Sequence, residues 1–407
     1  MSNNPIIKGK GVCDPHIHVF KDRAWLFASH DSSRENRTWL MNDWEIWSSD
    51  DLINWRYEST VRPEDTYIGP CERCWAVDAA EYKGKYYYYF SNGNKDTGVA
   101  VSDEPGGPYR DALGRPLIPE HTTTSLEYDP TVFVDPDSDI PYLIWGCIEG
   151  DGYFIAKLNE DMISLAEKPR QLMIDDGFAR DDKCFLHKKN SLYYLSWGSD
   201  YAVSENVYGP YKYRGTLGIS EDHGSFFSWK GQDFYAFTVF DPTNFYRASG
   251  LCYIHYMKNG DMKADRMIAE YGVGYYDSNW NKIQSEWFME QKNVTKEENV
   301  WGGFDTVIRG NEAELFYPGI KGVSDKKEIH FLITTKAEDA FIDLYDDRSG
   351  MLLGSVKTWV TGSRDRFGYR VSGTKLPVLS EYEDLDLRIR FRNIGSEPIY
   401  IHWFRFC

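Results

Sequence analysis

Short aromatic and aliphatic runs, separated by Gly, Asn, Asp and Ser, dominate the hydrophobic pattern of the chain. Runs such as GKYYYYFSNGN at 84–94 and NSLYYLSWGSD at 190–200 predict strands that end in tight turns. Helical spacing of apolar residues is almost absent. The pattern therefore predicts an all-β protein.

An internal repeat is the most informative feature of the pattern. An aromatic-rich strand occurs five times, and a shorter strand carrying a polar residue precedes each copy. One such unit alone would also fit a sandwich. Five units that cannot bury themselves singly predict a five-bladed β-propeller, with the polar residues of the inner strands converging on its axis. The aromatic strands are 24–31, 85–93, 141–146, 192–199 and 233–240, and their leaders are 13–20, 75–82, 128–135, 181–188 and 223–230.

The repeat fades after about residue 265. We therefore expect a propeller at 1–265, a connector at 266–282 and a second domain at 283–407. The last part alternates apolar and polar residues with a turn every dozen residues or so, which predicts a β-sandwich of jelly-roll type.

Composition narrows the choice of partner. The net charge is −17 and no Lys/Arg cluster is present, which argues against a nucleic acid. No apolar run is long enough to span a membrane, so we expect no membrane partner. Trp, Tyr and Phe make up 16% of the chain, which suits carbohydrate stacking and an all-β core equally. Oligomeric state stays open.

The N-terminal residues and the cysteines bear on localisation and on disulfide or zinc sites. The first twenty residues lack the apolar stretch of a signal peptide, so we expect a cytoplasmic protein, or a secreted or periplasmic one if a leader has been removed. Seven irregularly spaced cysteines do not form a disulfide framework. Cys71 and Cys74 form a single CxxC without the further ligands of a structural zinc site.

Acidic residues recur at one position of the leaders. Asp14 and Asp129 each precede a proline, which predicts an extended backbone there, and the pair Asp181 and Asp182 stands at the same phase. A single Asp-Pro step is an ordinary turn before a strand. Three acidic positions in phase instead predict converging carboxylates, whose mutual repulsion separates their pKa values as glycoside hydrolysis requires.

Two histidines lie two positions apart in the same leader. His16 and His18 would point to the same side of a strand. They could line the pocket beside Asp14 or form half of a metal site. We expect substrate contact rather than a metal site.

These segments together resemble glycoside hydrolase family 43, whose members are five-bladed propellers. The resemblance covers about 4–265. It is carried by two DP motifs and one HGS motif within NPIIKGKGVCDPHIHVFKDRAWLFASHD, WEIWSSDDLINW, CWAVDAAEYKGKYYYYFS, EYDPTVFVDPDSDIPYLIWG, NVYGPYKYRG and HGSFFSWKGQDFYAF.

The resemblance implies a role for each matching residue. Asp14 matches the general base, and Asp129 matches the aspartate that orients the general acid and tunes its pKa. His223 matches a histidine under the site floor that is often linked to a bound ion or water. Arg247 and Trp75 match substrate contacts. We add His16 and Asp78, the polar residue of the second leader, to the candidate substrate contacts.

The general acid departs from the family pattern. The family usually has a glutamate at the start of the fourth leader, and this chain has Asp182 there, one methylene shorter. We expect Asp182 to be the acid, with Asp181 and Glu127 as alternatives. A further alternative is a carbohydrate-binding propeller that has lost the acid and does not catalyse.

The C-terminal part resembles a family 6 carbohydrate-binding module. KIQSEWFME at 282–290, NEAELFYPGI at 311–320, IDLYDDRSGMLLGSV at 342–356 and IYIHWFRF at 399–406 carry this resemblance. Phe367 or Tyr369 could supply a stacking face. A sandwich that only braces the propeller is the alternative, and whether the domain binds calcium stays open.

The resemblance implies an inverting exo-glycosidase acting on pentose-rich oligosaccharides or polysaccharides such as xylan, of the α-L-arabinofuranosidase or β-xylosidase type. It implies no required cofactor. A structural calcium or other ion in the propeller channel, reached by His223 through water, is an additional expectation.

Overall fold

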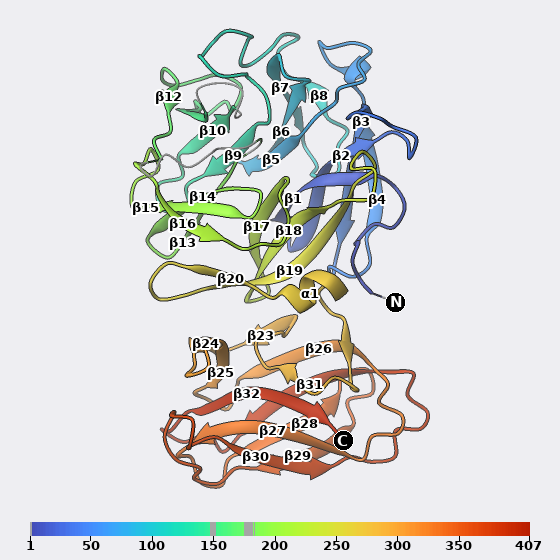
Figure 1. Cartoon of the computed structure of the whole chain (residues 1–407), viewed down its shortest axis with the longest axis vertical. Coiled ribbons are helices and arrows are strands. Elements are labelled where there is room, and N and C mark those ends of the chain that lie inside the picture. Colours follow the sequence, from blue (N-terminus) through green and yellow to red (C-terminus); the bar gives the residue numbers. More distant parts are fainter. Residues whose placement is uncertain (1, 147–151, 175–181, 183) are drawn as a thin grey trace. The chain divides into compact units, whose positions relative to one another are not determined.

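The computed structural model describes residues 2–146, 152–174, 182 and 184–407. The chain divides into two compact units, Met1–Phe227 with Asp233–Gly272, and Ser228–Gln232 with Val273–Cys407. Nearly all regular structure in both units is β (Figure 1). No described helix is both long and apolar enough to cross a membrane.

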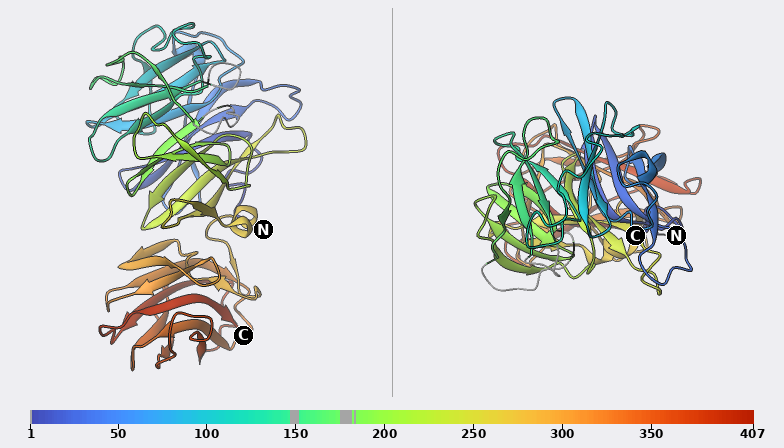
Figure 2. Two further views of the ribbon diagram at one scale, coloured as in Figure 1. Left: turned by 60° about the vertical axis from the view of Figure 1, so that its left-hand side comes forward. Right: turned by 90° about the horizontal axis from the view of Figure 1, so that it is seen from above.

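The described residues of the first unit form five four-stranded sheets, each made of consecutive strands (Figures 1 and 2). The predicted five-bladed propeller is confirmed, and each aromatic run forms the second strand of its sheet. The sheets are β1 (Val12–Phe20), β2 (Arg23–Asp31), β3 (Met41–Ser49) and β4 (Arg56–Val61); β5 (Val77–Tyr82), β6 (Lys85–Asn92), β7 (Asp96–Ser102) and β8 (Arg110–Asp111); β9 (Thr131–Val134), β10 (Pro141–Trp145), β11 (Phe154–Lys157) and β12 (Arg170–Gln171); β13 (Cys184–Lys189), β14 (Leu192–Trp197), β15 (Asp200–Ser204) and β16 (Lys212–Thr216); and β17 (Gly224–Trp229), β18 (Gln232–Val239), β19 (Ala248–Tyr256) and β20 (Met262–Ala264).

The first strands of successive sheets are neighbours. β1 contacts β5, β5 contacts β9 and β9 contacts β13, so these strands form the inner layer. The start of each inner strand is thus brought close to the starts of the others. This arrangement is what gathers chemically active residues that lie far apart in the sequence.

The aromatic run of β6 shows why these strands are buried on both faces. Side chains alternate along a strand, so Tyr86, Tyr88 and Phe90 pack against the first sheet, while Tyr87 and Tyr89 pack against the third. Fully burying such a ring contributes roughly 1.5–3 kcal/mol. A strand between two blades therefore needs large apolar groups at every position.

The N-terminal segment closes the ring. The amide of Ile6 donates to the carbonyl of Ser249 at 2.9 Å, and the amide of Leu251 donates to Oδ1 of Asn4 at 2.9 Å. Ser249 Oγ also donates to the carbonyl of Val12 at 2.9 Å. The first and fifth sheets are thereby joined. The described part of this unit also contains a 3₁₀ turn (Pro63–Asp65) and helix α1 (Arg266–Tyr271).

The second unit contains two six-stranded sheets. Tyr317 of one meets Phe404 of the other edge-on, with ring centroids 4.8 Å apart, so the sheets form a β-sandwich. Burial alternates along β31 as expected for strands with one buried face. One sheet holds β21 (Tyr276–Asp277), β23 (Glu290–Lys292), β26 (Glu314–Lys321), β28 (Phe341–Asp346), β29 (Leu352–Lys357) and β31 (Asp384–Arg392); the other holds β22 (Ile283–Gln284), β24 (Val294–Glu298), β25 (Phe304–Ile308), β27 (Glu328–Thr335), β30 (Arg370–Lys375) and β32 (Ile399–Phe406).

Candidate active site

One cavity of the first unit, of about 410 Å³, is lined by carboxylates from several blades. Aromatic rings and one arginine form much of the remaining wall. Such a mixture of apolar faces and convergent polar groups is typical of small-molecule sites. The lining residues are Asp14, Trp39, Met41, Trp75, Ala76, Asn94, Leu126, Tyr128, Asp129, Asp182, Gly198, Glu221, Asp222, His223, Phe240 and Arg247.

The two Asp-Pro steps turn their carboxylates inward by a left-handed backbone. Asp14 has φ of 51° and Asp129 has φ of 52°, so the predicted extended conformation is wrong at both positions. Aspartate is among the few residues that tolerate this region. Hydroxyl groups of other blades accept hydrogen bonds from the backbone amides of both aspartates. The Asp14 amide donates to Thr238 Oγ1 at 3.1 Å, and the Asp129 amide donates to Ser91 Oγ at 2.9 Å.

Arg247, directly before β19, joins three carboxylates. Its Nη1 donates to Oδ1 of Asp14 at 2.8 Å and to Oδ2 of Asp222 at 2.8 Å. Its Nε and Nη2 donate to the two oxygens of Asp31, each at 3.1 Å. Arg247, Asp14 and Asp31 are almost fully buried. A planar guanidinium suits such forked contacts, which a lysine cannot reproduce.

Burial and charge act in opposite directions within this group. Burial by itself would lower the pKa of Arg247, but the carboxylates, with Asp14 first, raise it well above its ordinary value. Burial raises the pKa of Asp31, and the charge of Arg247 offsets part of that rise. Arg247 therefore stays charged and favours the ionised form of Asp14.

His223 lies between two of these aspartates. Its Nε2 is 3.3 Å from Oδ1 of Asp222 and 3.8 Å from Oδ2 of Asp129. Single donor atoms of Asp14, Asp222 and His223 all lie within 4.8 Å of one another. Asp14 and Asp222 already accept hydrogen bonds from Arg247. A cation bound directly to these two carboxylates would therefore face the guanidinium charge. The group does not fit a calcium ion that uses these carboxylates as ligands.

Asp182 reaches the same cavity from the segment before β13. Tyr128 Oη donates to its Oδ1 at 2.6 Å, and the Tyr128 ring lies against Trp75, with centroids 5.9 Å apart. Asp182 itself is exposed. The tyrosine fixes one oxygen of this carboxyl group at the cavity wall.

Asp181 and Glu127 are the two alternatives for the general acid. Asp181 lies outside the described residues. Glu127 is buried and does not line the cavity. Its Oε1 accepts from the amide of Thr123 at 2.7 Å and its Oε2 from the amide of His121 at 3.1 Å. Glu127 therefore holds the loop before β9.

His16 and Asp78 do not line the cavity, so the substrate contact predicted for them does not fit their placement. Both are buried, and His16 Nδ1 lies 2.7 Å from Oδ1 of Asp78. His18 Nε2 lies 2.6 Å from the same oxygen. Burial would raise the pKa of Asp78, but the two imidazoles lower it well below its ordinary value. His16 and His18 follow Asp14 along β1, and Asp78 lies on the neighbouring strand β5.

Sequence reasoning missed several residues of this site. Asp31 ends β2, and Glu221 and Asp222 directly precede His223. The acidic pair beside the HGS motif was a visible indication. Trp39 lies in a connecting segment without a repeat, so no pattern marked it. Phe240 ends the fifth aromatic run and directly follows β18, but the repeat gave no sign that it lines the cavity.

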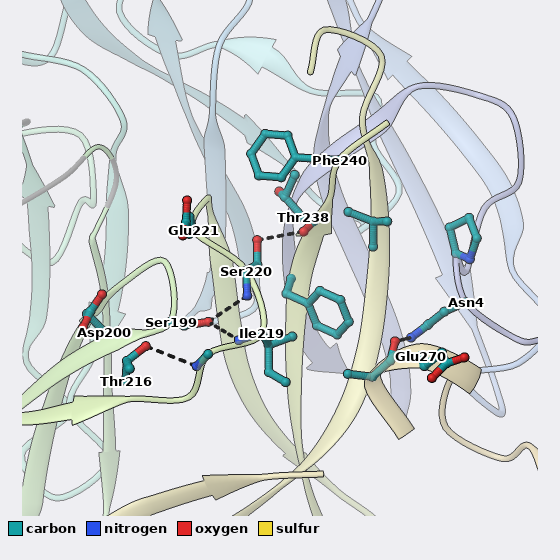
Figure 3. A pocket seen from close by; sticks show the side chains of 15 residues that line it. Asn4, Ser199, Asp200, Thr216, Ile219, Ser220, Glu221, Thr238, Phe240 and Glu270 are labelled. Carbon is teal, nitrogen blue, oxygen red and sulfur yellow. Dashed lines mark hydrogen bonds between the residues drawn. The ribbon is translucent and has the colours of Figure 1, made fainter. Parts of the chain in front are cut away.

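A second cavity of about 790 Å³ lies beside the fourth and fifth sheets (Figure 3). Glu221 and Phe240 line both cavities. Its polar groups largely satisfy one another: Ser220 Oγ donates to the Thr238 carbonyl at 2.8 Å, and Ser199 Oγ accepts the amide of Ser220 at 2.8 Å. It gathers no set of carboxylates around an arginine, so the smaller cavity is the better candidate.

The two residues predicted as stacking faces in the sandwich differ in exposure. Phe367 is 84% exposed, whereas Tyr369 is buried and donates its hydroxyl to Asp305. Of these two residues, Phe367 alone is available to a ligand.

Comparison with known proteins agrees with this geometry. The model of the glycosyl hydrolases family 43 matches residues 2–223. A xylosidase/arabinosidase of Bacteroides ovatus is 28% identical over 52% of this chain and 79% of its own. An arabinoxylan arabinofuranohydrolase of Paenibacillus polymyxa is 28% identical over 53% of this chain and 41% of its own.

Two solved structures extend the likeness. A family 43 arabinoxylan arabinofuranohydrolase of Bacillus subtilis, in complex with cellotetraose, covers 100% of this chain and 97% of its own at 20% identity and a TM-score of 0.58, which shows the fold of both units. A β-xylosidase/α-arabinofuranosidase from a compost metagenome, in a calcium-free complex with xylotriose, covers 64% of this chain and 96% of its own at 25% identity and a TM-score of 0.55. Since the family model spans more than half of the sequence, the chain belongs to glycosyl hydrolases family 43 and is a glycoside hydrolase.

Proposed function

We propose that the chain is an inverting exo-acting hydrolase that releases terminal arabinofuranosyl or xylosyl residues from plant oligosaccharides or polysaccharides such as xylan. The observation that carries the proposal is that Asp14, Asp129 and Asp182, from three different blades, line one cavity. Inverting hydrolysis needs a base and an acid on opposite sides of the scissile bond, roughly 6.5–9.5 Å apart.

Asp14 acts as the base in this proposal. Its carboxylate removes a proton from the water that attacks the anomeric carbon. The paired guanidinium of Arg247 keeps the carboxylate ionised and fixes its direction. The left-handed backbone at Asp14 aims the side chain into the cavity.

Asp182 protonates the leaving oxygen. The contact from Tyr128 orients its carboxyl group at the wall of the cavity. Asp129, buried beside His223, orients the acid during the reaction. Asp182 is one methylene shorter than the glutamate usual in the family, and its exposed side chain lines the cavity.

The wall of the cavity favours a neutral sugar. Trp39, Trp75, Tyr128 and Phe240 offer aromatic faces on which sugar rings stack. Glu221 adds a further carboxylate, while the one arginine is already paired with three aspartates. A uronic acid would therefore meet like charge.

The reaction needs only these side chains and water, as in other family 43 hydrolases, which require no cofactor. An ion near His223 would be held through water, because Asp14 and Asp222 are engaged by Arg247. No step of the proposed reaction runs through such an ion.

The sandwich unit is proposed to bind polysaccharide through exposed aromatic residues. Trp301, Trp359 and Phe367 are 43%, 48% and 84% exposed. Replacing Phe367 by alanine in the full chain should weaken retention on insoluble arabinoxylan. Unchanged retention would leave the unit as a structural brace.

Hydrolysis of nitrophenyl α-L-arabinofuranoside, β-D-xyloside and β-D-galactoside tests the main proposal. Wild type should cleave a pentoside, and Asp14→Asn should lose activity by several orders of magnitude. Asp182→Asn should lose far more activity on a natural disaccharide than on the nitrophenyl substrate, because only a poor leaving group needs a general acid. Asp50→Asn, at a surface pair with Arg23, is the matched control.

Two results would redirect the assignment. If Glu221→Gln shows the leaving-group pattern and Asp182→Asn does not, the acid is Glu221. If wild type binds xylo-oligosaccharides and cleaves none of the three substrates nor arabinoxylan, the chain is a carbohydrate-binding propeller that has lost its acid.

A further inference from the structure

His16, His18 and Asp78 bring three donor atoms together apart from the catalytic cavity. The histidines are two residues apart on β1 and share one face, and Asp78 is the second residue of β5. Oδ1 of Asp78 lies 2.7 Å from Nδ1 of His16 and 2.6 Å from Nε2 of His18. One donor atom from each residue lies within 4.8 Å of the other two.

The surroundings hold these side chains in place. The amide of Ala79 donates to Oδ1 of Asp78 at 2.8 Å, and the amide of Val132 donates to Oδ2 at 2.9 Å. The His16 ring meets Phe185 edge-on at 5.1 Å, and the His18 ring stacks on Phe20 at 5.7 Å. The carboxylate and both rings are thus oriented before any ligand arrives, as the outer shell of a metal site requires.

The partial exposure of His18 leaves a route by which an ion can reach the three donor atoms. The side chains of His16 and Asp78 are 0% exposed, whereas that of His18 is 20% exposed. An ion could therefore enter past His18, and the buried carboxylate would provide its charge partner.

We propose that His16, His18 and Asp78 form a binding site for a divalent transition-metal ion of the zinc class. Two imidazole nitrogens and one carboxylate oxygen suit zinc, whereas calcium and magnesium prefer oxygen ligands throughout. Bonds of about 2.0–2.1 Å in a tetrahedron place donor atoms roughly 3.3 Å apart. Each histidine nitrogen, now 2.7 or 2.6 Å from Oδ1 of Asp78, therefore needs to move away from that oxygen by less than about 1 Å. A water molecule would take the fourth position.

The site would join the first two blades. His16 and His18 belong to the first sheet and Asp78 to the second, so one ion would link β1 to β5 in the inner layer. An ion that binds only the folded chain stabilises it by mass action. The expected role is structural, and it is independent of the proposed hydrolysis.

Zinc titration of the full chain tests the site. A Cys407→Ser background is used because Sγ of Cys407 lies 3.6 Å from Nδ1 of His330 and could hold zinc at the surface. The chain is stripped with a chelator, dialysed and titrated with ZnCl₂ by calorimetry, and the bound metal is counted by mass spectrometry. We expect one equivalent of zinc, a rise in Tm, and a tetrahedral visible spectrum when Co²⁺ replaces zinc.

Matched variants locate the ion. His18→Phe keeps a ring on Phe20 and should weaken zinc binding by more than about 100-fold, since it removes a ligand rather than an outer-shell group. His18→Gln serves if His18→Phe does not give a folded circular dichroism spectrum. His30→Phe is the control, because His30 pairs with Asp43 at 2.7 Å outside this group.

A third variant separates the two candidate groups. His223→Asn removes the histidine of the catalytic cavity and should keep one equivalent of zinc. The proposal is overturned if wild type binds no zinc, if the folded His18 variants keep the full equivalent, or if His223→Asn loses it.

Discussion

Nη1 of Arg247 lies 2.8 Å from Oδ1 of Asp14, although the two residues are 233 positions apart in the sequence. The same guanidinium also holds Asp31 and Asp222. The proposed base therefore depends on a residue of the fifth blade for both its charge and its direction.

Replacing Arg247 by methionine should damage both stability and catalysis. Three carboxylates, two of them buried, would lose the guanidinium contact, and breaking a buried pair costs about 3–5 kcal/mol. We expect the free energy of unfolding, from urea titration, to fall by about that amount and kcat to fall at least about 100-fold, in line with the loss of a key electrostatic contact. Arg214→Met, at the more exposed pair with Asp261, should cost less than about 1 kcal/mol. Similar losses for both variants would contradict the account.

Tyr128 is expected to act as a positioning residue for Asp182. Tyr128→Phe removes the 2.6 Å hydrogen bond while keeping the ring against Trp75. We expect kcat to fall roughly 10-fold on substrates with poor leaving groups, with a smaller effect on nitrophenyl pentosides and little change in KM. Tyr57→Phe, an exposed tyrosine bonded to Thr60, is the control. A pure KM effect would place Tyr128 in substrate binding alone.

The acid stability of the propeller should depend on His187. Burial lowers the pKa of this histidine to about 3, and the charge of Lys189 adds to the effect while Asp233 opposes it. The folded state therefore keeps His187 neutral, so its contribution is complete above the ordinary pKa of 6.5 and is lost as the pH falls toward 3. The slope is about 1.4 kcal/mol per pH unit for one group.

The variant His187→Phe removes that dependence. Its ring fits the stack with Phe226 and Tyr194, while the hydroxyl of Tyr256 loses its partner. Urea unfolding between pH 7 and pH 4 should show a shallower loss of stability for the variant than for wild type. Parallel curves would show that His187 is not buried in the neutral form.

Gly224 should not tolerate a methyl group. A Cβ at this position would lie 2.5 Å from the carbonyl oxygen of Ala236 and 2.7 Å from the ring of Tyr235. We expect Gly224→Ala to lower the free energy of unfolding by about 1–3 kcal/mol. Gly310→Ala, where no atom lies within 4 Å, should change it by less than about 0.5 kcal/mol. Equal effects in urea titration would contradict the packing described here.

The sequence predicted much of the fold because each blade repeats one local rule. Alternating large side chains, as in β6, mark a strand buried on both faces without reference to the rest of the chain. The spacing of the leaders likewise placed Asp14, Asp129 and Asp182 at equivalent inner positions, and all three line the cavity.

What the sequence could not predict depends on contacts between blades. Asp31 ends an ordinary strand, and only the folded chain brings it to Arg247. The backbone of Asp14 and Asp129 departs from the usual preference before proline because neighbouring hydroxyls hold their amides. His16 and Asp78 looked like substrate contacts, yet they pair with each other because the inner strands are adjacent.

The configuration of the first sugar released tests the central claim most directly. Proton NMR during hydrolysis of an α-L-arabinofuranoside or a β-D-xyloside distinguishes the two anomers before they interconvert. The account predicts that the released sugar first appears with the opposite anomeric configuration, β-arabinose or α-xylose, and that Asp14→Asn abolishes its formation. A product that first appears with retained configuration would contradict the roles assigned to Asp14 and Asp182.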